Sequence, residues 1–203
     1  MKSFIISVFR VLKKIVSTFL NSYDKSITYL VFYINNIQFT SFTTKGIPYV
    51  RITKGAKCLI GNNFKINNTI RSNPIGRNQK CILSVSNKGT LIIGNNVGMS
   101  CSSIVCMNEI TIGNNVMFGG GCCIYDSDFH PIDPAKRTSL QNEFTNHNSV
   151  LIGDNVFIGA HSTILKGVSI GENSVIGACS VVTKSIPCNE IWAGNPAKYI
   201  KSI

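Results

Sequence analysis

Residues 126–133, DSDFHPID, form the group of side chains best suited to acid–base chemistry in this chain of 203 residues. His130 lies among three carboxylates, of which Asp128 is the nearest in the sequence. An imidazole accepts a proton near neutral pH and can serve as a general base toward a hydroxyl group. A carboxylate beside it can fix the tautomer of the ring and stabilise its protonated form. We predict His130 as a catalytic base and Asp128 as the residue that orients it.

The chain has two other histidines. His147 lies farther along the same segment and is the weaker candidate for the base, because no acid adjoins it in the sequence. His161 falls between Ile158 and Ser162, two positions that the repeat described below turns inward. We therefore expect His161 at a corner of the fold or on its surface.

The eight cysteines are scattered singly, except for the adjacent pair Cys122 and Cys123. A chain of this length does not need disulfides to fold, and no signal peptide is evident. No Cys or His cluster has the spacing of a zinc site. We expect reduced thiols, no bound metal and a cytoplasmic protein.

The formal net charge of +11 belongs to the first part of the chain. Through Lys88 there are fourteen Lys and Arg and one acid, Asp24, whereas the remainder has six basic and eight acidic residues. This asymmetry suits an anionic surface or an acidic acceptor. Nucleic acid is not expected, because the sequence has no zinc-finger spacing, no basic heptad region and no aromatic pair among its lysines.

A six-residue repeat in the C-terminal third indicates which elements position His130. Units that start at residues 152, 158, 164, 170 and 176 read IGDNVF, IGAHST, ILKGVS, IGENSV and IGACSV. The first position is aliphatic, the fifth is Val or Ser, and IGNN units recur at 60, 93 and 112. A helix cannot keep a period of six on one face, whereas a short strand followed by a bend can.

Three such units would close a triangular turn, with positions one and five inward and Gly and Asn at the corners. Successive turns would stack at the strand spacing of about 4.8 Å and form a parallel β-helix of the all-β class. The repeat is absent from Tyr125 to Ser149. We therefore expect a protruding loop there, and this loop carries His130.

The sequence divides into three expected segments. Residues 1–45 form a helical and extended N-terminal segment, residues 46–186 form the β-helix with the loop 125–149, and residues 187–203 form a C-terminal cap. Residues 3–20 have apolar side chains at helical spacing, and basic residues in their middle make this helix a poor bilayer span. It packs either on its own domain or, peripherally, against a membrane surface, so that membrane association stays open. Residues 27–39 are expected as a strand or a second helix.

The stretch IGDNVFIGAHSTILKGVSIGENSVIGACSVVTKSIP, followed by AGNPAKYI, resembles the hexapeptide-repeat acyltransferases, and within them the sugar O-acetyltransferases. The resemblance runs from about Ile60 to Ile200 and implies that the β-helix is left-handed, which strand geometry alone would not predict. The segments SNPIG, GMSCSSI and DSDFHPID are similar to those of capsule and surface-polysaccharide acetyltransferases. Members of that family place a catalytic His where this chain has His130.

The same resemblance implies acetyl-CoA as the co-substrate, bound in a groove along the coils. The matching positions are two small residues at repeat corners and four residues near the C-terminus: Ala160, Ala178, Thr183, Lys184, Lys198 and Lys201. The two alanines would expose backbone groups to the pantetheine arm, and the lysines would lie near the nucleotide phosphates. Ala160 and Ala178 are expected on adjacent turns at one corner. The related enzymes place the acceptor site between two coils, which implies a homotrimer.

These features predict an acetyl-CoA-dependent O-acetyltransferase that acts on a sugar hydroxyl of a bacterial surface glycan or its precursor. The hydroxyl would attack the thioester directly, with His130 as the general base. Two alternatives remain open. One is N-acetylation of an amino sugar, and the other is a non-catalytic β-helix that binds glycan or membrane.

Overall fold

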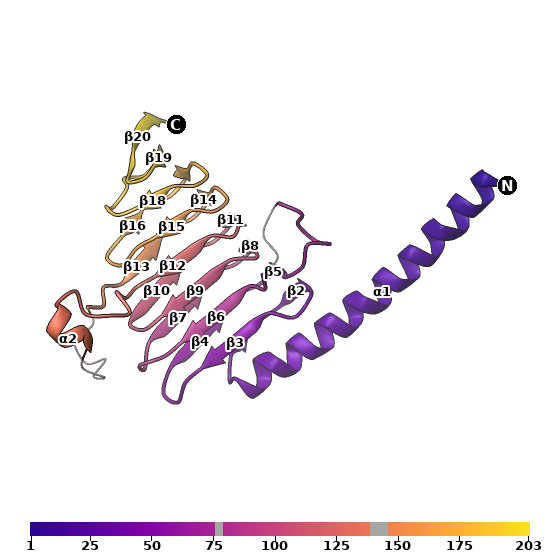
Figure 1. The fold of residues 1–203 in the computed structure, drawn as a ribbon, viewed down its shortest axis with the longest axis horizontal. Coiled ribbons are helices and arrows are strands. Elements are labelled where there is room, and N and C mark those ends of the chain that lie inside the picture. Colours follow the sequence, from indigo (N-terminus) through magenta and orange to yellow (C-terminus); the bar gives the residue numbers. More distant parts are fainter. Residues whose placement is uncertain (76–78, 139–145) are drawn as a thin grey trace.

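The computed structural model describes residues 1–75, 79–138 and 146–203, and it shows a long helix that leads into a column of stacked coils (Figure 1). Helix α1 (Lys2–Ile34) comes first, and the chain then winds repeatedly through three faces. A short helix, α2 (Pro134–Thr138), protrudes from the side of the column.

Each face of the column is a parallel sheet to which successive coils add one strand. Sheet A contains β1 (Gln38–Phe39), β4 (Lys57–Ile60), β7 (Thr90–Ile93), β10 (Glu109–Ile112), β13 (Val150–Ile152) and β16 (Ser169–Ile170). Sheet B contains β2 (Phe42–Lys45), β5 (Phe64–Asn67), β8 (Gly98–Ser100), β11 (Met117–Gly120), β14 (Phe157–Ile158), β17 (Val175–Ile176), β19 (Glu190–Gly194) and β20 (Ala197–Ser202). Sheet C contains β3 (Tyr49–Ile52), β6 (Ile82–Val85), β9 (Ser103–Cys106), β12 (Cys123–Tyr125), β15 (Thr163–Ile164) and β18 (Val181–Val182). The final pair, β19 and β20, is antiparallel and closes the column.

The strand register reproduces the six-residue repeat. Ile60, Ile93, Ile112, Ile152 and Ile170 lie directly above one another in sheet A, and all are buried. The Val and Ser residues at the fifth position are buried as well. The predicted parallel β-helix, with positions one and five inward, is therefore confirmed.

A ladder of asparagine side chains holds the corner between sheets A and B. Each Nδ2 donates to the Oδ1 of the residue one coil higher at 2.9–3.0 Å, through Asn63, Asn96, Asn115, Asn155, Asn173 and Asn189. All six have φ between 56° and 60°, a left-handed conformation that Asn tolerates better than most residues. Beside this ladder, the Asp154 carboxylate accepts the N–H of Asn114 at 2.7 Å, and this bond lowers the pKa of the carboxyl group.

Only the C-terminal half of α1 is attached to the column. Asp24, Thr28 and Phe32 are buried, and the Asp24 carboxylate accepts the N–H of Gly46 at 2.7 Å. Residues 2–19 are exposed, and this half of the helix points away from the coils (Figure 1). None of the described helices has the length and apolarity needed to cross a membrane.

Three expectations about the N-terminal segment need correction. The expected helix over 3–20 is too short, because no Gly or Pro interrupts the chain before α1 ends at Ile34. Residues 27–39 are therefore the last turns of α1 followed by β1, not a separate element. The β-helix begins at Gln38, before the expected boundary at 46, since β1 already pairs with β4. Residues 3–20 do not pack on their own domain, because residues 2–19 are exposed and the buried contacts of α1 begin at Asp24.

The expected loop 125–149 falls between β12, which ends at Tyr125, and β13, which begins at Val150, and it contains α2. Its residues 139–145 lie outside the described part of the chain, as does Gly76 of the SNPIG segment.

Candidate active site

His130 projects from the loop at the corner between sheets C and A, on the side where α2 protrudes in Figure 1. Its backbone N–H donates to the carbonyl oxygen of Asp128 at 2.7 Å, which closes a tight turn. Phe129 in the middle of this turn has φ 61° and donates its N–H to Ser127 Oγ at 3.1 Å. The side chain of His130 is exposed. A defined backbone turn thus presents the imidazole to solvent.

The two ends of the loop run side by side where they leave the column. Ser127 lies opposite His147 in an antiparallel bridge. The N–H of Asp128 donates to the carbonyl oxygen of Asn146 at 3.2 Å, and the N–H of Asn148 donates to that of Asp126 at 3.0 Å. This pairing brings the alternative base, half-buried His147, to the neck of the same loop that carries His130.

Asp126 has a structural role at the base of the loop. Its side chain is fully buried, and its two carboxylate oxygens accept the N–H groups of Met107 and Asn108, each at 2.8 Å. These bonds satisfy backbone donors at the corner of the coil below. Both oxygens are therefore engaged by the backbone, away from the imidazole of His130.

Asp128 forms an ion pair that the sequence did not predict. Its Oδ1 lies 3.1 Å from Lys166 Nζ, and each side chain is about one quarter exposed, at 25% and 24%. The other oxygen, Oδ2, is buried and has no hydrogen-bond partner among the described residues. Within the same part of the chain, no carboxylate is hydrogen-bonded to the imidazole of His130. The repeat register places Lys166 at a corner one coil above the loop. This position is the feature of the sequence from which the ion pair with Asp128 could have been predicted.

An aromatic pair packs beside the loop, and a buried thiol, Cys122, lies at the other end of β12. Tyr125 packs edge-on against Phe129 with ring centroids 5.1 Å apart. Burial, with a hydrogen bond to Cys123, raises the pKa of the Tyr125 hydroxyl to about 12. Burial also raises the pKa of the Cys122 thiol to about 11, so this thiol stays protonated at neutral pH. A thiol in that state is a poor nucleophile.

The two predicted small residues lie at the corner between sheets B and C. The N–H of His161 donates to Gly120 O at 2.9 Å, and the N–H of Cys179 donates to Ala160 O at 2.8 Å. Ala160 and Ala178 therefore stack on adjacent coils, as expected from their spacing. His161 occupies this corner with φ 63°, which confirms its predicted corner position.

The other predicted cofactor residues lie in two further places. Thr183 and Lys184 are exposed at the corner between sheets C and A, one coil above Lys166. Lys198 and Lys201 are exposed on β20, at the end of sheet B. Within one chain, His130 thus shares a corner with Thr183 and Lys184.

Sheet C separates the corner of His130 from the corner of the two alanines. Six residues of chain lead from Ala160 to Lys166, an extended length of up to about 20 Å. Within one chain the predicted base and the small-residue corner lie at opposite edges of sheet C.

The repeat region matches a known family description. Residues 149–184 match the family "Bacterial transferase hexapeptide (six repeats)". A Dictyostelium discoideum protein with a provisional acetyltransferase name is 52% identical over 94 residues, which cover 46% of this chain and 47% of that protein. The chain spans about half the length of the curated relatives it matches.

Solved structures extend the similarity beyond the repeat. A hexapeptide-repeat acetyltransferase of Vibrio cholerae, in complex with acetyl-coenzyme A, is 28% identical with a TM-score of 0.51, covering 59% of this chain and 60% of that chain. A maltose O-acetyltransferase of Clostridium difficile is also 28% identical, with a TM-score of 0.54, covering 93% of this chain and 88% of that one.

The coils, the corner ladders and the six-residue register define a parallel β-helix with a protruding loop, and its similarity to the hexapeptide-repeat acetyltransferases makes it left-handed. Residues 149–184 match the bacterial transferase hexapeptide family, and over a larger part of its length the chain is similar to hexapeptide-repeat acetyltransferases.

Proposed function

We propose that the protein is an acetyl-CoA-dependent O-acetyltransferase that modifies a sugar hydroxyl of a surface glycan or its precursor. The observation that carries the proposal is the exposed imidazole of His130, held by a closed backbone turn on a loop that is pinned at its neck. The Vibrio cholerae relative is bound to acetyl-coenzyme A, and the Clostridium difficile relative is named for O-acetylation of a sugar. These similarities support the co-substrate and the type of acceptor.

The chemistry assigned to the chain is two proton transfers, one from the sugar hydroxyl to His130 and one from His130 to the departing sulfur. Acetyl-CoA supplies the acetyl group as a thioester. His130 removes the proton of the sugar hydroxyl while that oxygen bonds to the acetyl carbon, and it later returns the proton to the departing sulfur. Backbone N–H groups stabilise the negative oxygen that develops on the carbonyl. The high pKa of the buried Cys122 thiol favours this direct route over an acyl-enzyme on that residue.

Asp128 is proposed to position His130. Its carbonyl oxygen holds the backbone of His130, and its carboxylate ties the turn to Lys166 on the next coil. The buried Oδ2 keeps an unused acceptor within the loop. This oxygen can accept an N–H from a protonated imidazole, which would stabilise that state during the transfer.

The cofactor contacts are proposed from the remaining matched positions. Ala160 and Ala178 leave the backbone of one corner uncovered for the pantetheine arm, because their side chains are single methyl groups. Thr183 and Lys184 at one corner, with Lys198 and Lys201 on β20, carry the groups that suit the nucleotide phosphates. All four of these side chains are exposed.

The separation of the two corners supports a homotrimer. In such an assembly the corner of one copy that bears His130 meets the alanine corner of its neighbour, and each site draws on two copies. A complete site then requires assembly, because sheet C keeps the two corners of one chain apart.

The exposed half of α1 is proposed to rest on a membrane surface. Its apolar side chains include Phe4, Ile5, Val8, Phe9 and Leu12, which lie together along the helix. A helix with such a stripe and basic residues on its other side suits the interface of a bilayer.

The proposal is tested by measuring release of coenzyme A from acetyl-CoA against a panel of bacterial surface glycans. An active acceptor should yield a product from which hydroxylamine removes the acetyl group, since esters are cleaved and amides resist. Acetyl groups that survive hydroxylamine would show N-acetylation instead. Tight glycan binding without release of coenzyme A would show a non-catalytic β-helix.

A further inference from the structure

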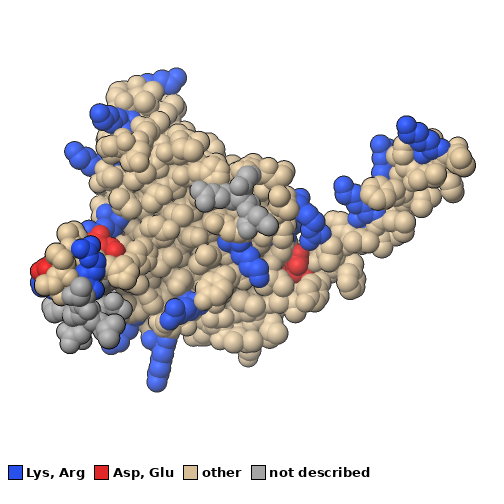
Figure 2. All heavy atoms as spheres, viewed as in Figure 1, with Lys and Arg blue, Asp and Glu red and all other residues tan. Residues whose placement is uncertain are grey.

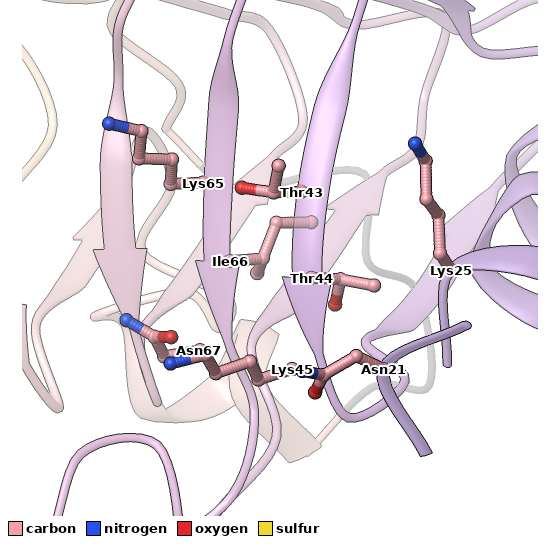
Figure 3. A pocket seen from close by; sticks show the side chains of 8 residues that line it. All are labelled: Asn21, Lys25, Thr43, Thr44, Lys45, Lys65, Ile66 and Asn67. Atoms are coloured by element: carbon pink, nitrogen blue, oxygen red, sulfur yellow. The ribbon is translucent and has the colours of Figure 1, made fainter. Parts of the chain in front are cut away.

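A hollow lies where α1 meets the first two coils (Figure 3), whereas the loop of His130 leaves the column after β12. The hollow has a volume of about 430 Å³ and is walled by α1, β2 and β5. Its lining includes three lysines, two asparagines and a threonine, from α1 and from two neighbouring strands: Lys25, Lys45, Lys65, Asn21, Asn67 and Thr43. We call these six residues the lysine hollow. The wall thus offers three cations and several hydrogen-bonding groups beside apolar surface that includes Ile66.

The positive charge of the lysine hollow is not neutralised by ion pairs. In residues 1–75, 79–138 and 146–203, the one ion pair joins Lys166 to Asp128, far along the chain. Asp24 is the one acid before Glu109, and its carboxylate is buried and bound to the N–H of Gly46. The three lysines therefore face solvent with their charges available to a ligand.

The basic side of α1 continues this charge beyond the column. Arg10 precedes Thr28 by five helical turns, and Lys14 precedes Phe32 by the same interval. Thr28 and Phe32 are buried against the column, so Arg10 and Lys14 point to the side of the helix on which the column lies. Figure 2 shows basic side chains along α1 and where it joins the coils, with little acidic surface among them.

The chemistry of the lysine hollow fits an acidic sugar better than a lipid headgroup. Lysine ammonium groups attract a carboxylate or phosphate as point charges, while the asparagines and Thr43 can hydrogen-bond to sugar hydroxyls. The apolar stripe of α1 faces elsewhere: Leu12 lies two residues from both Arg10 and Lys14, about 200° around the helix. A bilayer under that stripe would therefore lie on the side of α1 opposite the hollow.

We propose that the lysine hollow binds an acidic residue of the acceptor glycan, a sugar that carries a carboxylate or a phosphate. This inference rests on the proposed function, because it names the class of acceptor for that reaction. The hollow lies on the first two coils, whereas His130 leaves the column at the fourth. It therefore holds a part of the glycan that is not the reacting sugar, and it raises the affinity for long acidic acceptors.

The test measures binding of fluorescent oligogalacturonate by anisotropy, at low salt and without acetyl-CoA. The methyl ester of the same oligosaccharide is the uncharged control probe. The variant K45Q/K65Q removes two charges from the hollow, and K54Q/K57Q removes two exposed charges from the same coils outside it. We expect K45Q/K65Q to weaken binding about tenfold, which follows from two partly screened ion pairs, and K54Q/K57Q to leave it within twofold. Competition by glucose 6-phosphate and by glucuronate then shows which acid is preferred.

Three results would overturn the proposal. Equal weakening in both variants would mean general charge attraction, and equal binding of the methyl ester would mean that the acid is not recognised. A third result combines two observations: the protein does not bind the oligosaccharide, and K45Q/K65Q binds phosphatidylglycerol vesicles less well than the parent does. That result would assign the hollow to a membrane surface. The outcome is independent of catalysis: specific binding without formation of a hydroxylamine-sensitive acetyl group would refute the proposed function and leave the binding site standing.

Discussion

Replacement of Gly159 by Ala tests whether the coils are stacked as closely as the register requires. A Cβ at Gly159 would lie 2.5 Å from the backbone N of Ala178 and 2.8 Å from its Cα. Ordinary contacts at such an atom begin near 3.4 Å, so the overlap with the next coil is about 0.9 Å. These neighbours are backbone atoms, which cannot rotate away as the end of a side chain could.

The cost follows from the movement needed to relieve that overlap. Separation of the coils would stretch the hydrogen bonds from the N–H of Gly159 to Ile176 O and from the N–H of Cys179 to Ala160 O, both 2.8 Å long. Overpacking costs about 1–3 kcal/mol, and each weakened bond adds up to about 1 kcal/mol. We expect Gly159→Ala to lower the free energy of unfolding by about 3 kcal/mol. For a chain of this size, that lowers the melting temperature by about 10 °C.

Gly98 provides the matched control, because a Cβ there meets no atom within 4 Å. Gly98→Ala should therefore change the free energy of unfolding by less than about 0.5 kcal/mol. Thermal unfolding followed by circular dichroism, with urea titration as a second measure, compares the two variants. Equal melting temperatures for Gly159→Ala and Gly98→Ala would refute the close stacking of the corner that carries Ala160 and Ala178.

Further predictions concern the cofactor, the assembly, the loop and the acid response. Lys184→Ala and Lys198→Ala should raise the KM for acetyl-CoA more than they lower kcat, and more so at low salt, in steady-state kinetics. Light scattering at micromolar concentration should give the mass of a trimer, and a monomer would contradict the composite site. Asp128→Asn should lower turnover less than loss of His130, because it weakens positioning without removing the base. The pKa of Asp154 is lowered in the folded state, so its carboxylate stabilises the fold above its usual value of 3.8 and this contribution is lost as the pH falls through the lowered pKa. Asp154→Asn should accordingly have a lower melting temperature than the parent at pH 7 and the same melting temperature near pH 2. An equal difference in melting temperature at both pH values would contradict this role of the Asp154 carboxylate.

Local patterns were sufficient to predict most of the β-helix. The sequence shows the aliphatic residue that opens each unit, the Asn residues of the corners and the gap after Tyr125, each within a few residues. The structure gives those Asn residues a positive φ. Each coil repeats the same local solution, so the register of one coil predicts the next. The stacking of Ala160 on Ala178 followed from their spacing alone.

The errors arose where the repeat gives no information. The apolar side chains of 27–39 serve two elements, because Phe32 of α1 packs on Phe39 and Phe42 of the first coil with ring centroids 5.5 and 5.0 Å apart. Only tertiary contact separates the helix from the strand there. The choice between Asp126 and Asp128 also depended on contacts with other coils. Asp126 reaches the backbone of the coil below, and Asp128 reaches Lys166 on the coil above.

The most direct test of the account compares His130→Ala with His147→Ala in steady-state turnover and acetyl-CoA affinity. A positioned base contributes on the order of 10²–10⁴ to the rate, so His130→Ala should lose about that factor in kcat. Acetyl-CoA affinity and melting temperature should stay near those of the parent, because the His130 side chain is exposed on the loop and other residues make the proposed cofactor contacts. If His130→Ala keeps more than about a tenth of the parent turnover while His147→Ala loses it, the base lies at the other end of the loop and the central claim is wrong.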